Sequence, residues 1–138
     1  MRFVACAAVL FWATALTVVD IRQRRLPNAL TLPGAALVVM VAVAYGRGPA
    51  ALYGAVGLTA LYLTVHLVAP GGLGAGDVKL AVGLGALTGA FGPDVWLLGA
   101  VGAPVLTAVF GVLGRTRTLP HGPSMCVASL AAAALAVF

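Results

Sequence analysis

The chain has 138 residues, of which 62% are hydrophobic and only 8% are charged, and its net charge is +5. Eight basic and three acidic side chains cannot form the polar surface of a soluble domain, which excludes soluble globular and disordered classes. At about 20 residues per membrane-spanning helix, the length predicts an all-α integral membrane protein with about six transmembrane helices, short loops and a single domain over residues 1–138.

The basic excess and the cysteines exclude further classes. No aromatic-rich basic patch is present, so the positive charge predicts membrane topology and contact with anionic lipid headgroups, and no nucleic acid partner. Cys6 and Cys126 are the only cysteines, and no C-x-x-C pair occurs. We therefore expect no cysteine zinc site. We also expect no disulfide, since the predicted topology puts the two cysteines near opposite faces of the bilayer.

Six apolar runs are long enough to predict spans. The first ends at Asp20 and is followed by arginines rather than by a cleavage signal, which favours a span over a signal peptide. Asn28 is predicted to cap the second helix, and Pro33-Gly34 to kink or delay it. The predicted spans are residues 3–19, 29–45, 50–68, 78–90, 95–113 and 124–138.

A glycine-rich stretch precedes the fourth span. Pro70 and the glycines up to Gly76 are expected to break the helix, which leaves Asp77 at the end of a flexible, side-chain-poor segment. Gly85 and Gly89 have small-xxx-small spacing, which predicts close approach of another helix.

Lysine and arginine counts in alternating loops predict the orientation. Six basic residues lie on one side of the membrane, and the other two, Arg2 and Arg47, lie on the opposite side. This difference places the loops after the first, third and fifth spans in the cytoplasm. Asp20 and Asp77 then emerge on the same face, and Asp94 on the opposite face. The six are Arg22, Arg24, Arg25, Lys79, Arg115 and Arg117.

Asp20 and Asp77 are the candidate reactive pair. Two nearby carboxylates cannot both ionise cheaply, so the pair is expected to share a proton. One acid and one base could activate a water molecule against a peptide bond. Gly74 and Gly76 would let a substrate backbone lie close to them. Solvated helix ends and lysine-paired acids remain the structural alternatives.

Three motifs in order resemble the type IV prepilin peptidase family of membrane aspartic endopeptidases. They are Asp20 followed by LPNALTLPG at residues 26–34, GAGDVKL at 74–80, and LPHGPS at 119–124. The first two are similar to the family's catalytic aspartate elements, of which the second is a GxGD motif. The third is similar to the Pro-x-Gly-Pro element that opens the family's last helix.

The resemblance implies a hydrolase that removes the short basic leader from prepilins or pilin-like precursors in type IV pilus and protein secretion systems. Cleavage would occur at the cytoplasmic face of the inner (plasma) membrane. Asp20 and Asp77 would polarise a water molecule and protonate the leaving amine, with no cofactor and no metal. The substrate would enter laterally from the lipid as a helix and unwind beside the two aspartates.

The chain also departs from larger family members. These carry an N-terminal cytoplasmic segment with paired C-x-x-C elements, and many methylate the new N-terminus using S-adenosylmethionine. This chain starts at its first apolar run and has neither feature. The resemblance therefore implies the compact form of the family and gives no support for methyl transfer.

Supporting residues and other functions complete the expectations. Lys79 is predicted to anchor the chain at the lipid surface or to tune the charge of the pair, and Asn28 to cap a helix or orient Asp20. His66 is expected to have a buried packing role, and His121 is given no role.

Two alternative functions remain. One is a transporter or channel, whose acids would lie nearer the midplane, and the other is a non-catalytic pilus assembly factor. The oligomeric state is left open.

Overall fold

The computed structural model describes residues 2–23, 26–71, 73–114 and 121–137, and these form six helices without strands. This confirms the predicted all-α class. The helices are α1 (Arg2–Gln23), α2 (Asn28–Ala44), α3 (Gly48–Val68), α4 (Ala75–Phe91), α5 (Pro93–Gly114) and α6 (Gly122–Val137).

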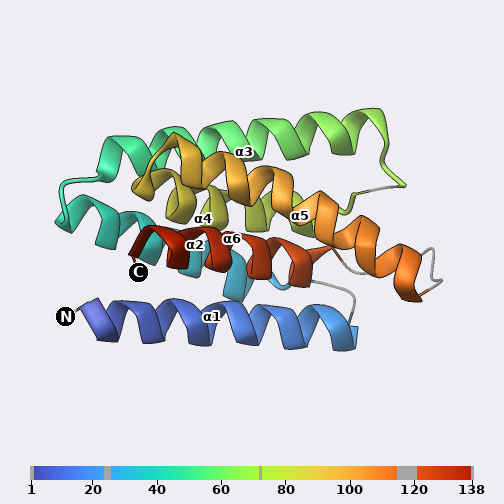
Figure 1. The fold of residues 1–138 in the computed structure, drawn as a ribbon, viewed down its shortest axis with the longest axis horizontal. Helices are drawn as coiled ribbons and strands as arrows, with labels where there is room; N and C mark the ends of the chain where they lie inside the picture. Colours follow the sequence, from blue (N-terminus) through green and yellow to red (C-terminus); the bar gives the residue numbers. More distant parts are fainter. Residues whose placement is uncertain (1, 24–25, 72, 115–120, 138) are drawn as a thin grey trace.

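Successive helices run in opposite directions, so both termini lie at one end of the bundle (Figure 1). The last turns of α1, α3 and α5 and the first turns of α2, α4 and α6 face the other end. The central helix is α4, whose backbone lies close to α2, α3, α5 and α6. Among the described residues, the backbone of α1 lies close only to α2 and α6, and its side chains Trp12 and Leu16 reach α4. This topology brings the C-terminal end of α1 to the same side as the N-terminal end of α4.

Many large apolar side chains are exposed on the surface of the bundle. Three helices, α1, α3 and α5, are long and apolar enough to cross a membrane, and α2 and α6 are shorter apolar helices. Large side chains such as Phe3, Leu67 and Val112 are exposed on the outside, where only lipid can cover them without cost. The buried core centres on Leu16, Leu80 and Leu84. The protein is an integral membrane protein.

Glycine allows α3 and α4 to pack with their backbones close together. A Cβ on Gly89 would lie 2.7 Å from the Cα of Gly54, and one on Gly85 would lie 2.9 Å from the Cβ of Leu58. Both distances are too short for real Cβ contacts, so these positions require glycine. The structure thereby confirms the close approach predicted from the spacing of Gly85 and Gly89.

Two local expectations are wrong. The fourth helix begins at Ala75 rather than at Val78, so Asp77 lies in its first turn and not before it. Asn28 does not cap α2, because Pro27 occupies the cap position and Asn28 is already helical. Pro33 is the sixth residue of α2 and does not delay the start of the helix, which begins at Asn28.

Candidate functional site

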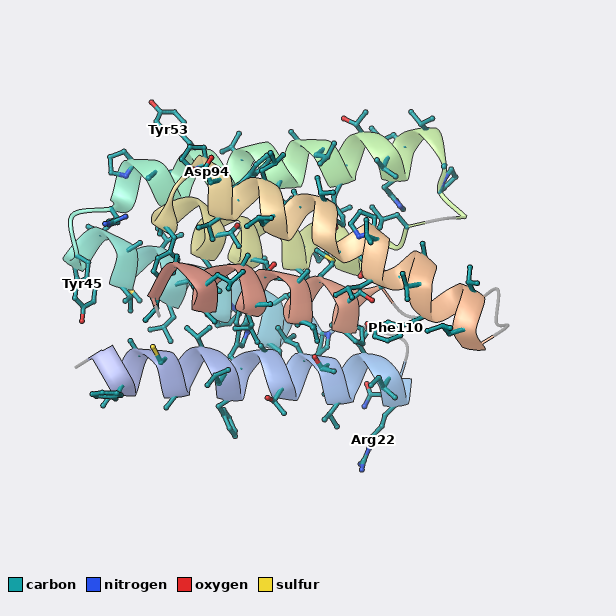
Figure 2. All side chains as sticks on the ribbon, viewed as in Figure 1. Arg22, Tyr45, Tyr53, Asp94 and Phe110 are labelled. Atoms are coloured by element: carbon teal, nitrogen blue, oxygen red, sulfur yellow. The ribbon has the colours of Figure 1, made fainter. Side chains whose placement is uncertain are left out.

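A cleft of about 660 Å³ opens at the end of the bundle opposite the termini. The last turn of α1, the start of α2 and the first turn of α4 form its walls. Figure 2 labels Arg22 near this end, and Tyr45 and Asp94 at the other. The cleft brings together all six candidate residues from the sequence. Its lining is Asp20, Gln23, Leu26, Pro27, Asn28, Gly74, Ala75, Gly76, Asp77 and Lys79.

Asp20 is the more deeply buried of the two aspartates. It lies in the last turn of α1 and is only 6% exposed. Its carboxylate packs against Gly122, the first residue of α6, so closely that a Cβ there would overlap Oδ2. Oδ2 has no hydrogen-bond partner among the described residues. A helix N-terminus attracts negative charge, so α6 supplies a favourable field to an otherwise unpaired oxygen.

Asp77 lies at the start of a different helix. It is half-buried at the third position of α4, and its Oδ2 accepts a long hydrogen bond of 3.4 Å from the backbone amide of Gly74. This contact satisfies one of the free amides that begin a helix. Asp77 also lies within electrostatic range of Asp20. Two helix N-termini therefore hold two interacting carboxylates in one cleft, an arrangement that can share a proton and orient a water molecule.

Lys79 and Asn28 form a polar link across the cleft. Lys79 Nζ donates a 2.7 Å hydrogen bond to Asn28 Oδ1, which joins α4 to α2. The sequence did not predict this link, because a contact between residues 51 positions apart leaves no local pattern. Described residues include no group of three or more His, Cys, Asp or Glu side chains suited to a metal ion.

The two glycines of GAGD have different surroundings. A Cβ on Gly76 would lie 3.2 Å from the Cβ of Leu26, so this glycine lets α4 approach the segment that leads into α2. A Cβ on Gly74 would meet only Asp77 Oδ2, at 3.7 Å, and the residue is exposed. The cleft side of Gly74 is therefore open enough for another chain to lie against it.

Sequence reasoning missed a histidine beside this site. The His121 ring is bound by Tyr62, whose hydroxyl lies 3.0 Å from Nε2, and by Thr107, whose hydroxyl lies 2.6 Å from Nδ1. Burial lowers the pKa of His121 below its ordinary value. The partners lie on α3 and α5, so only the position of His121 in LPHGPS, next to a predicted helix start, could have indicated it.

His66 also does more than pack. Its Nδ1 lies 2.6 Å from the carbonyl oxygen of Leu73, which immediately precedes Gly74. This bond holds the connection between α3 and α4 next to the first turn of α4. Cys6 and Cys126 are both free, as expected.

Comparison with known proteins agrees with the motifs. The profile of the type IV leader peptidase family matches residues 7–138. Neither the comparison with curated proteins nor that with solved structures found a match. Since the family match runs through both aspartates and nearly the whole chain, the protein belongs to the type IV leader peptidase family.

Proposed function

We propose that this protein is an aspartic endopeptidase that removes the leader peptide from prepilins or pilin-like precursors. Its family supports a leader peptidase. The observation that carries the aspartic mechanism is that Asp20 and Asp77, from two separate helices, line one cleft. Among the described acidic residues, only Asp94 is left out, and it is exposed at the other end.

The chemistry needs only these two side chains and water. One carboxylate takes a proton from the water molecule, whose oxygen then attacks the carbonyl carbon of the scissile peptide bond. The protonated partner gives its proton to the substrate, and the nitrogen leaves as an amine when the C–N bond breaks. The products are a new carboxylate on the leader and a new amine on the mature pilin.

The surroundings of the cleft suit a precursor with an apolar helix. The cleft lies where apolar helices end, so the substrate helix can stay in lipid while its polar leader reaches the aspartates. Open space beside Gly74 gives an extended backbone room to approach Asp77. The excess of basic residues at this end supports a cytoplasmic active site in the inner membrane, by the positive-inside rule.

The experiment uses purified protein in liposomes with a prepilin substrate. We expect Asp20→Asn and Asp77→Asn each to lower the cleavage rate by about 100-fold or more, the usual contribution of a general acid or base. Asp94→Asn is the matched control and should retain activity, because Asp94 is exposed and far from the cleft.

Full cleavage by either cleft variant would refute the aspartic mechanism. A wild-type protein that cleaves no prepilin but supports pilus assembly would instead favour a non-catalytic assembly factor. Solute flux that survives both changes would favour a transporter, although the acids lie at helix ends rather than at the midplane.

A further inference from the structure

Three polar side chains form a partly buried cluster outside the cleft, in which Tyr62 is buried and Thr107 and His121 are half-buried. Tyr62 comes from α3, Thr107 from α5, and His121 directly precedes α6. Both ring nitrogens of His121 are engaged, Nε2 by Tyr62 and Nδ1 by Thr107. Polar groups inside an apolar bundle are costly unless they are paired, and here each pairs with another.

Counting protons assigns the donors in this cluster. The Thr107 hydroxyl has one proton, and it donates it to the carbonyl oxygen of Ala103 at 3.1 Å, an oxygen that can only accept. With its proton in that bond, the hydroxyl accepts from His121, and we therefore assign the ring proton to Nδ1. In a neutral ring Nε2 is then an acceptor, and the Tyr62 hydroxyl donates to it.

The cluster lies where it can control the position of Asp20. The carbonyl oxygen of His121 accepts the Met125 amide at 3.0 Å, which is the first backbone bond of α6. The next residue, Gly122, packs against the Asp20 carboxylate. Anchoring the ring on α3 and α5 therefore determines where the N-terminus of α6 meets α1. Tyr62 also lies within electrostatic range of Asp77.

We propose that His121 is a positioning residue for Asp20: Tyr62 and Thr107 hold its neutral, Nδ1-protonated ring, and the ring holds Gly122 against the carboxylate. His121 is not among the residues that line the cleft, so we assign it no contact with the substrate. The inference rests on the proposed function in that it assigns Asp20 a part in cleavage. Loss of the cluster should let the N-terminus of α6 shift, and the Asp20 carboxylate would shift with it.

The first test removes each anchor without changing its shape. Tyr62→Phe and Thr107→Val should each lower kcat for prepilin cleavage about 10-fold with KM changed less than about twofold, because misplacing a reacting group slows chemistry more than binding. Tyr53→Phe and Thr64→Val are the matched controls. Tyr53 is exposed on α3, and Thr64 is exposed and bonds Ala60 as Thr107 bonds Ala103. Unchanged kcat in both cluster variants would overturn the proposal.

Comparing a conservative with a non-conservative substitution of His121 separates a positioning role from an effect on the stability of the whole protein. His121→Gln can still accept the Tyr62 proton through its amide oxygen, whereas His121→Ala cannot. We expect the Gln variant to retain several-fold more kcat than the Ala variant at similar melting temperatures. Losses of kcat that simply follow the melting temperature in all variants would show a structural role only.

Nitrogen-15 NMR of histidine-labelled protein tests the cluster without cleavage. The chain has two histidines, so the spectrum of His66→Gln assigns His121. We expect His121 to be neutral and protonated at Nδ1, and Tyr62→Phe to shift its Nε2 resonance. A ring protonated at Nε2 would overturn the inference whatever the protein cleaves. If the wild type cleaves no prepilin, the proposed function fails, while this spectrum still decides the state of His121.

Discussion

The two helices that carry the aspartates are held in very different ways. α4 is surrounded by four helices, and a hydrogen bond joins each of its ends to another part of the bundle. Near its start, Lys79 donates a hydrogen bond to Asn28. Near its end, the carbonyl oxygen of Ala90 accepts a 3.0 Å hydrogen bond from Arg47. In contrast, the described backbone of α1 lies close only to α2 and α6, and α1 reaches α4 through the side chains of Trp12 and Leu16. Asp77 therefore stands on the central helix of the bundle, and Asp20 on a peripheral one.

Among the described residues, α1 has few hydrogen bonds to other helices, and this difference has a consequence for activity. The indole nitrogen of Trp12 donates a 2.7 Å hydrogen bond to the carbonyl oxygen of Leu30 on α2, and Gly122 of α6 packs against Asp20. Changes around α4 should mainly reduce stability, because they disturb the core. Changes where α1 meets α2 and α6 should reduce cleavage more than stability, because they move one carboxylate relative to the other.

The largest stability effect is expected at the crossing of α3 and α4. Gly89→Ala would place a Cβ 2.7 Å from the Cα of Gly54 and 2.8 Å from the carbonyl oxygen of Ala50. Backbone atoms cannot move aside as side chains do, so we expect a loss of about 3 kcal/mol or more, at or above the usual cost of overpacking. Thermal unfolding in detergent measures it.

The matched control for this change is Gly71→Ala, since nothing lies within 4 Å of a Cβ there. Equal melting temperatures for Gly89→Ala and Gly71→Ala would show that the close crossing does not hold α4.

The largest effect on cleavage from the α1 side is expected at Gly122. Gly122→Ala inserts a methyl group against the Asp20 carboxylate. We expect kcat to fall about 100-fold, as a displacement of a catalytic group can do. The melting temperature should fall less than in Gly89→Ala. A variant that keeps full activity would show that the contact between α6 and Asp20 is not needed.

The sequence predicted the membrane fold and the aspartate pair because both depend on local patterns. Apolar run lengths identified the spans, and alternating charge placed Asp20 and Asp77 at the same end. The start of α4 was missed because glycines favour loops in isolation, whereas here Gly74 caps the helix and Gly76, in its first turn, packs against Leu26. The link from Lys79 to Asn28 and the His121 cluster were missed because they join residues on different helices.

A smaller and more selective effect is expected from two tryptophans. Trp12→Phe removes the bond from α1 to Leu30, and Trp96→Phe removes an equivalent 3.0 Å bond from α5 to the carbonyl oxygen of Gly54. Each should cost more than the roughly 1 kcal/mol of one hydrogen bond, because the indole ring also packs, beside Gly83 in the case of Trp12 and beside Gly57 in the case of Trp96. Only Trp12→Phe should also lower kcat by several-fold. Equal losses of kcat in the two variants would remove the distinction between α1 and the rest of the bundle.

The smallest effect concerns acid stability at the start of α6. Burial lowers the pKa of His121 from its ordinary value of 6.5, so the unfolded chain takes up a proton more readily than the folded one as pH falls. The folded state therefore loses stability as pH falls below about 6.5. His121→Gln lacks this group, so its melting temperature should fall less than that of the wild type between about pH 7.5 and 5.5. A variant as acid-sensitive as the wild type would contradict this.

Cross-linking tests most directly whether the two aspartates meet in one site. In a background with Cys6→Ala and Cys126→Ala, which removes both free thiols, Asp20→Cys is combined with either Asp77→Cys or Asp94→Cys. A short bifunctional thiol reagent is added in liposomes, and the linked peptides are identified by mass spectrometry. We predict an intramolecular link for the first pair and none for the second. A protein that links residue 20 to residue 94, or that leaves residues 20 and 77 unlinked, would contradict a shared site.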